Sequence, residues 1–261
     1  MKKSKNYTKI TTHTLQEMKN NGEKIAMLTA YDYSFAKLID QANIPLILVG
    51  DSASMTMYGY DTTIPVSMDE MLLIVKAVTR GTQNALVVAD MPFLSYQPSV
   101  EETIKNAGLF MKEGGAGAVK LEGGKHMFNN LKALVDCGIP VLGHVGLTPQ
   151  SYHQMSGYKI QGKTIEGAQK IIADAQAIEE AGAFGVVLEC IPETLATDIT
   201  KSLTIPTIGI GSGNTCDGQI QVFHDIMGLT KNNPPRHAKK YGKLYNTMLD
   251  IVNQYQKDVK K

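Results

Sequence analysis

The stretch GVVLECIPETLATDITKSLTIPTIGI, residues 185–210, decides the fold class. It begins with a short apolar run at Gly185–Leu188, continues into a helical pattern at Glu193–Ser202, and returns to a second apolar run at Pro206–Ile210. Both runs are apolar at nearly every position, as expected for parallel strands that are covered on both faces. The stretch therefore predicts a strand, a crossover helix and a second, parallel strand.

The same alternation continues along the whole chain. The other runs that predict strands are Ile25–Thr29, Pro45–Val49, Ala85–Ala89, Ala118–Leu121, Ile139–Leu142 and, more weakly, Ile220–Phe223. The other patterns that predict helices are Tyr33–Gln41, Asp69–Thr79, Val100–Glu113, Met127–Asp136 and Glu166–Ala181. Eight strands separated by helices predict an α/β fold, the closed (β/α)8 TIM barrel. The alternative is an open doubly wound sheet, but the turn after the first strand, Thr29-Ala30-Tyr31-Asp32, lacks the Gly-x-Gly-x-x-Gly pattern.

Length and composition favour one sizeable core. The chain has 261 residues, of which 43% are hydrophobic, the usual size of a single α/β barrel. We expect residues 1–261 to form one barrel domain, with a capping helix at Leu15–Asn20 under the barrel and a helical extension after Pro235.

Charge and cysteine usage exclude several classes of protein. The formal net charge is +1, so no strong field attracts nucleic acid or an anionic membrane. No apolar run is long enough to cross a bilayer, and no apolar stretch follows the N-terminal lysines as in a signal peptide. Cys137, Cys190 and Cys216 lack metal-ligand spacing, and we expect free thiols in a reducing cytoplasm.

Polar side chains occur where the predicted strands end. Four of them are carboxylates, and they follow strands two, three, four and six: Asp51, Asp90, Glu122 and Glu189. Barrel enzymes carry their chemistry at this C-terminal edge, and the two long connections, 51–67 and 144–163, follow strands there too. Because side chains alternate along a strand, Lys120 should share a face with Glu122. The same rule places Asp51 with Val49, and Glu189 with Val187.

A cluster of carboxylates needs a counter-charge. Four carboxylates in one barrel mouth would repel one another, and Lys120 alone cannot balance them. A divalent cation could, and ligation by oxygen alone suits Mg²⁺. Each residue also has a simpler interpretation. A carboxylate at a strand end can be a helix cap or a loop ion pair, Ser52 a helix cap, His144 a structural histidine, and Lys120 an ion-pair partner.

Seven stretches, read together, resemble those of one enzyme family. They span residues 29–228 in the family's order: Thr29–Ala36, Val49–Ser52, Ala89–Phe93, Val119–Gly124, Gly143–Gln150, Leu188–Cys190 and Gly209–Asn214, the last followed by Asp217–Gln219. On these residues the chain is similar to the ketopantoate hydroxymethyltransferase family. One departure is Ala53-Ser54-Met55, where many members have Leu-Gly-Met.

The resemblance implies a fold, an activity and an assembly. The fold would be a barrel of the phosphoenolpyruvate/pyruvate superfamily type, assembled as a cytoplasmic homodecamer. The activity would be Mg²⁺-dependent transfer of a hydroxymethyl group from 5,10-methylenetetrahydrofolate to 3-methyl-2-oxobutanoate. The product, 2-dehydropantoate, begins pantothenate synthesis. The implied partners are small molecules and further copies of the chain, without nucleic acid or membrane.

The resemblance also implies roles for individual residues, each at a position where a motif of this chain matches the family. They are Asp51, Asp90 and Glu122 at the metal, Asp51, Ser52, Asp90 and Lys120 at the oxo acid, and Glu189 as general base. Direct ligation is implied for the two aspartates, and ligation through water for Glu122.

Three other functions remain to be weighed. A related lyase of the same barrel type would split a carbon–carbon bond, but the chain has no Lys-Lys-Cys-Gly-His-type loop. A Schiff-base aldolase would use Lys120 as nucleophile, although nearby carboxylates hold a lysine in its charged form. A catalytically inactive barrel could serve as a scaffold, yet the intact carboxylate set argues against it.

Overall fold

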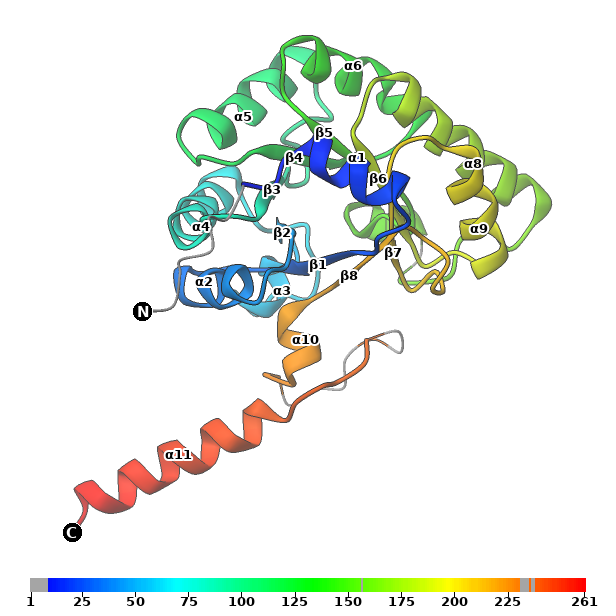
Figure 1. The fold of residues 1–261 in the computed structure, drawn as a ribbon. Helices are drawn as coiled ribbons and strands as arrows, with labels where there is room; N and C mark the ends of the chain where they lie inside the picture. Colours follow the sequence, from blue (N-terminus) through cyan, green and yellow to red (C-terminus); the bar gives the residue numbers. More distant parts are fainter. Residues whose placement is uncertain (1–8, 156, 231–234, 236–237) are drawn as a thin grey trace. The chain divides into compact units, whose positions relative to one another are not determined.

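The computed structural model describes residues 9–155, 157–230, 235 and 238–261, and Figure 1 shows its ribbon. The chain divides into two compact units, Met1–Ile220 and Gln221–Lys261. The prediction of one domain over residues 1–261 therefore stays a prediction.

Eight parallel strands form a closed barrel in chain order. They are β1 Ile25–Thr29, β2 Leu46–Val49, β3 Leu86–Asp90, β4 Ala118–Glu122, β5 Val141–Gly146, β6 Gly185–Glu189, β7 Thr207–Ile210 and β8 Gly218–Gln221. The predicted barrel is confirmed, and the open doubly wound sheet is wrong. Parallel strands in a closed ring all end at the same edge, which is what brings the strand-end side chains together.

Helices surround the strands, as Figure 1 shows. They are α2 Tyr33–Gln41, α4 Met68–Gly81, α5 Val100–Lys112, α6 Phe128–Asp136, α8 Ile165–Glu180 and α9 Glu193–Ser202. Side chains cap several N-termini: Asp32 accepts from Phe35 N, and Ser67 forms a capping box with Glu70. Such caps satisfy N–H groups that the first helical turn leaves unpaired, which explains why these helices begin where they do.

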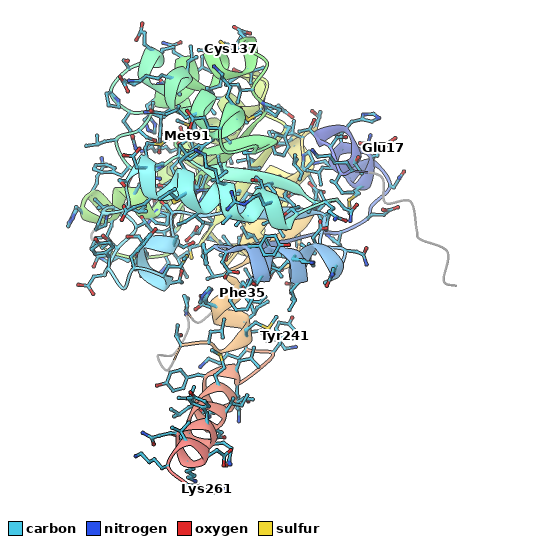
Figure 2. All side chains as sticks on the ribbon, turned by 90° about the vertical axis from the view of Figure 1, so that its left-hand side faces the viewer. Glu17, Phe35, Met91, Cys137, Tyr241 and Lys261 are labelled. Atoms are coloured by element: carbon cyan, nitrogen blue, oxygen red, sulfur yellow. The ribbon has the colours of Figure 1, made fainter. Side chains whose placement is uncertain are left out.

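The barrel interior is filled by alternate strand residues. In β2 these are Leu46 and Leu48, in β3 Leu86 and Val88, and the helix α1, Thr12–Asn20, adds the buried side chain of Leu15 to the same cluster. Val49 is also buried but lies outside this cluster. Figure 2 shows the side chains of the described residues on the ribbon.

The eighth strand differs from its prediction. The apolar pattern predicts a strand at Ile220–Phe223, whereas β8 is Gly218–Gln221 and Phe223 begins a helix. The reason is close contact with the first strand: a Cβ at Gly218 would collide with the carbonyl oxygen of Ile25. Glycine lets β8 approach β1 here, at a position that hydrophobic patterning does not mark.

The second unit is helical. It contains α10, Phe223–Met227, and α11, Leu244–Val259, and no residue of α11 is buried. The predicted helix after Pro235 thus starts at Leu244; residues 231–234 and 236–237 lie outside the described residues. None of the helices described is long and apolar enough to span a membrane.

Candidate active site

The four predicted carboxylates converge at the C-terminal edge of the barrel. Asp51, Asp90 and Glu122 are at most 5% exposed, and the side chain of Glu189 is 15% exposed. Two long connections lie beside them and carry short helices: α3 Ala53–Thr56, η2 Pro149–Ser151 and α7 Tyr152–Met155. The arrangement is a buried, strongly acidic site, which barrels of this class use for chemistry.

Lys120 is the buried cation at the centre of this site. Its Nζ lies 2.6 Å from Asp90 Oδ1 and 4.0 Å from Glu122 Oε1, so Lys120 and Glu122 share a face as predicted. Burial lowers the pKa of Lys120, but the charges of Asp90, Glu122 and Asp51 outweigh burial and raise it. Lys120 therefore remains an ammonium ion at neutral pH.

Asp51 reaches the site against strand alternation. Alternation places it with Val49, which lies outside the interior cluster, yet the Asp51 carboxylate accepts a hydrogen bond from Gln150 Nε2 at 3.0 Å. Its own N–H donates to Asp90 Oδ2 at 3.2 Å. Strand alternation does not extend to Asp51, because β2 ends at Val49 and Asp51 lies in the turn that follows. Burial and the nearby Asp90 charge raise the pKa of Asp51 well above its usual range.

His144 joins two of the carboxylates. Its Nδ1 lies 3.5 Å from Glu122 Oε1, and its Nε2 lies 3.2 Å from Glu189 Oε2. Burial and the Lys120 charge lower the pKa of His144, but the two glutamates outweigh them and raise it to about 9. The two carboxylates favour the protonated imidazole, with which each forms an ion pair. The interpretation of His144 as a pocket residue is the one that the geometry supports.

Two further residues complete the site, and the sequence did not single them out. Gln150 links Asp51 and Glu122, since its Nε2 reaches Asp51 Oδ2 and its N–H donates to Glu122 Oε2 at 3.0 Å. Tyr96 lies behind it, with its hydroxyl 2.9 Å from Gln150 Oε1. The available signal was the position of Gln150 in the long connection after strand five.

Ser52 is not a side-chain helix cap. It precedes α3, but its hydroxyl makes no capping hydrogen bond and lies 2.7 Å from the Tyr31 hydroxyl. Its predicted contact with the oxo acid stays a prediction.

The chemistry of this donor set fits a divalent cation. Four carboxylates face two cations, Lys120 and His144, and leave an excess of two negative charges when all are ionised. Glu122 Oε1 is buried and has no hydrogen-bond partner among the described residues. Oxygen donors of this kind suit Mg²⁺. Within the described part of the chain, no three His, Cys, Asp or Glu side chains are already placed around one point as a metal group.

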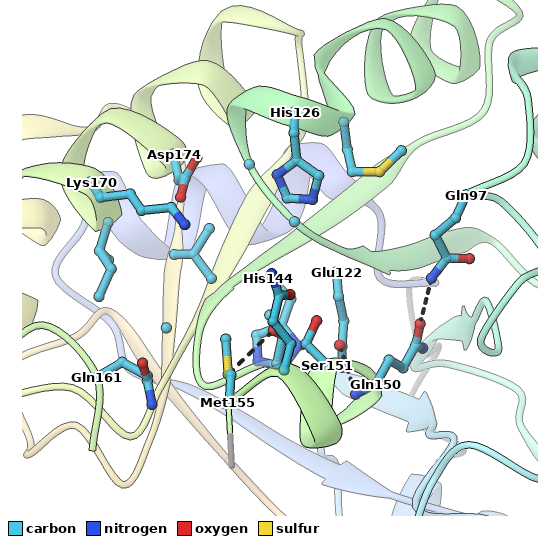
Figure 3. A pocket seen from close by; sticks show the side chains of 18 of the residues that line it. Gln97, Glu122, His126, His144, Gln150, Ser151, Met155, Gln161, Lys170 and Asp174 are labelled. Carbon is cyan, nitrogen blue, oxygen red and sulfur yellow. Dashed lines mark hydrogen bonds and ion pairs between the residues drawn. The ribbon is translucent and has the colours of Figure 1, made fainter. Parts of the chain in front are cut away.

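A pocket of about 270 Å³ opens beside these residues. Figure 3 shows Glu122, His144 and Gln150 at its centre, Gln97 on one side, and Lys170 and Asp174 of α8 on the other. Met127, Met155 and Ile171 are among the apolar residues that line it. Asp51, Asp90 and Lys120 do not line it, so the pocket and the buried ion cluster adjoin each other through Glu122 and His144.

Comparison with solved structures agrees with the barrel. A phosphonopyruvate hydrolase in complex with oxalate and Mg²⁺ superposes with a TM-score of 0.64 at 14% identity, covering 96% of this chain and 87% of that one. A 2,3-dimethylmalate lyase, a member of the PEP mutase/isocitrate lyase superfamily, gives a TM-score of 0.59 at 14% identity over 94% and 96% of the two chains. At this level of identity the likeness concerns the fold.

Sequence comparison gives much closer relatives. A 3-methyl-2-oxobutanoate hydroxymethyltransferase of Dehalococcoides mccartyi is 54% identical over 96% of this chain and 89% of its own length. An enzyme of the same name from Clostridium botulinum is 55% identical over 96% of this chain and 91% of its own length. The sequence profile of the ketopantoate hydroxymethyltransferase family matches residues 9–261. The chain therefore belongs to the ketopantoate hydroxymethyltransferase family.

Proposed function

We propose that this protein transfers a hydroxymethyl group from 5,10-methylenetetrahydrofolate to 3-methyl-2-oxobutanoate, giving 2-dehydropantoate. The observation that carries the proposal is the convergence of Asp51, Asp90, Glu122 and Glu189 around Lys120 and His144 at the C-terminal edge of the barrel. The names of relatives more than 50% identical support it. In sum, the oxo acid, methylenetetrahydrofolate and water give 2-dehydropantoate and tetrahydrofolate.

The metal in this proposal is Mg²⁺, held by Asp51, Asp90 and Glu122. When bound, it supplies a Lewis acid that stabilises negative charge on the 2-oxo group. The barrel neighbour whose structure contains oxalate and Mg²⁺ supports a site of this kind.

Lys120 and Ser52 bind and orient the oxo acid. Because Lys120 keeps its proton, it offsets the charge of the substrate carboxylate and is a poor nucleophile for a Schiff base. The Ser52 hydroxyl, which contacts the Tyr31 hydroxyl, is an uncharged group that forms a hydrogen bond with the oxo acid.

Glu189 is the base that removes the C3 proton onto its carboxylate. His144 Nε2 lies 3.2 Å from Glu189 Oε2 and holds this group in place. General base catalysis requires such a carboxylate to be fixed within reach of the proton it takes. The carbon left behind forms its new bond to the one-carbon unit, whose two bonds to the folate nitrogens break. Water supplies the hydroxyl oxygen, and the nitrogens take up the protons that balance the reaction.

The pocket beside Glu122 and His144 is where we place the one-carbon donor. Its lining contains apolar as well as polar residues and includes Glu122 and His144 of the ion cluster, so a carrier bound there would lie next to the oxo acid without displacing the cluster. Homodecameric assembly, a cytoplasmic location and a role in pantothenate synthesis belong to the same proposal.

The test is a turnover assay with purified protein, following 2-dehydropantoate by mass spectrometry. Product should require the oxo acid, methylenetetrahydrofolate and Mg²⁺, and omission of any one should abolish it. Loss of the oxo acid without product would favour a lyase, and absence of any reaction under complete conditions would contradict the proposal.

A further inference from the structure

Gln150 uses every hydrogen-bonding group of its side chain. Its Nε2 donates to Asp51 Oδ2 at 3.0 Å and to the carbonyl oxygen of Met91 at 2.9 Å. Its Oε1 lies 2.9 Å from the Tyr96 hydroxyl and accepts from Gln97 Nε2 at 3.2 Å. The side chain is 4% exposed. A buried amide with two donors and two acceptor positions occupied has one favourable orientation, because turning it over would break all four contacts.

The backbone of the same residue holds a second carboxylate. Gln150 N donates to Glu122 Oε2 at 3.0 Å. Asp51 follows β2 and Glu122 ends β4, so one residue from the connection after β5 joins the ends of two other strands. Each carboxylate has one oxygen fixed in this way. The other oxygen of Glu122, Oε1, is one of the buried atoms without a hydrogen-bond partner in the described structure, and its contacts are ion pairs with His144 and Lys120.

Tyr96 reinforces this orientation. Its hydroxyl also lies 3.2 Å from both the N–H and the carbonyl oxygen of Glu122. Tyr96 is 1% exposed, so it belongs to the rigid interior rather than to a mobile rim. The contacts form a chain from the core through Tyr96 and Gln150 to both carboxylates.

We propose that Gln150 is a positioning residue: it fixes one oxygen of Asp51 and one of Glu122 so that their remaining oxygens face the cation and the oxo acid. The inference rests on the proposed function for the identity of those ligands. A neutral amide between two carboxylates also separates like charges without adding a third one. Gln150 itself lines the pocket beside the site but is not assigned as a ligand of the oxo acid or of the cation.

The experiment compares three proteins: the parent, Gln150→Met and Gln176→Met. Met approximates the length of Gln and removes the amide, and Gln176 lies on the exposed face of α8, which makes it a matched control. Mg²⁺ binding is measured by calorimetry without substrate, and exchange of the C3 proton of 3-methyl-2-oxobutanoate is measured in D₂O. We expect Gln150→Met to bind Mg²⁺ at least about tenfold more weakly, in the range for loss of a supporting group, and Gln176→Met to match the parent.

A second variant keeps the inference testable if Gln150→Met does not fold. Gln150→Glu preserves volume and both acceptor positions but removes the donor to Asp51. We expect its exchange rate at saturating Mg²⁺ to fall at least about tenfold, whereas a merely structural residue would lower the melting temperature and leave that rate unchanged. Affinity and exchange equal to those of the parent in whichever variants fold would overturn the inference.

Measurements on the parent, the unsubstituted protein, distinguish a failure of this inference from a failure of the proposed function. A parent that binds Mg²⁺ but exchanges no proton would contradict the proposed function, while the affinities of the variants would still decide the role of Gln150. A parent that binds no Mg²⁺ would overturn the positioning role as well.

Discussion

The partly buried ion pair at one end of the barrel and the buried ion cluster at the other differ in how their charges are matched. At the end where the strands begin, Lys19 Nζ donates to Asp217 Oδ2 at 2.9 Å and to the carbonyl oxygens of Leu203 and Ile205. Asp217 Oδ2 also accepts from the N–H and hydroxyl of Thr207. This ion pair has one positive and one negative charge, and all three ammonium hydrogens have an acceptor.

At the mouth, negative charges outnumber positive ones, and several atoms of the ion pairs lack a hydrogen bond. Four carboxylates face Lys120 and His144, while Glu122 Oε1 and both ring nitrogens of His144 lack a hydrogen bond within the described structure. A partly buried pair whose hydrogen bonds are all made can stabilise the fold, but buried polar atoms without hydrogen bonds are costly unless a ligand uses them. The comparison indicates that the end where the strands begin, the floor, contributes to stability, whereas the C-terminal edge, the mouth, binds ligands.

The largest effect is expected at Glu189. Glu189→Gln keeps the shape of the side chain but cannot take a proton, so C3 exchange should fall by about 10² to 10⁴, the usual worth of a general base. Mg²⁺ affinity should stay near that of the parent. The exchange rate is measured by NMR in D₂O and the Mg²⁺ affinity by calorimetry. Exchange at the parent's rate would show that Glu189 is not the general base.

The next largest effect is expected at Asp90. Asp90→Asn removes the charge that pairs with Lys120 at 2.6 Å and, in the proposed function, a metal ligand. Mg²⁺ affinity measured by calorimetry should fall by about 100-fold or more. Asp198→Asn on the exposed side of α9 is the matched control, and equal affinity in the two variants would count against a cation at the mouth.

A change at the floor should affect stability alone. Lys19→Met leaves Asp217 without its cation, and we expect the free energy of unfolding to fall by about 2 kcal/mol. C3 exchange per folded molecule should not change. Lys132→Met, which removes an exposed pair with Asp136 on α6, should cost less than about 0.5 kcal/mol. Slower C3 exchange in folded Lys19→Met would contradict the view that the Lys19 end of the barrel contributes to stability alone.

The smallest effect is the response of stability to Mg²⁺. At ten times its dissociation constant, a ligand that binds only the folded state adds about 1.4 kcal/mol to the free energy of unfolding. Urea titrations should show this gain for the parent and for Lys19→Met, but not for Asp90→Asn at the same concentration. A gain in all three proteins would place the cation elsewhere.

Much of this arrangement follows from local sequence. Tyr33–Gln41 and Glu193–Ser202 are helices with the predicted bounds, because their apolar spacing and flanking residues are local signals. The convergence of the four carboxylates follows from strand-end positions in a parallel barrel. The roles assigned to them remain predictions.

The links between those residues are not local. Gln150 meets Asp51 and Tyr96 across long stretches of chain, and no spacing rule predicts such pairs. Asp51 departs from strand alternation because the strand ends before it, and β8 is displaced because Gly218 permits contact with Ile25. Both depend on tertiary packing, which patterns of hydrophobicity do not encode.

The most direct test of the central claim is exchange of the C3 proton of 3-methyl-2-oxobutanoate in D₂O, followed by NMR with Mg²⁺ and again with excess chelator. Metal-assisted enolisation at the barrel mouth predicts exchange with Mg²⁺ that stops when the metal is removed and returns when it is restored. Exchange that continues unchanged in chelator would contradict it and would favour a Schiff base on Lys120.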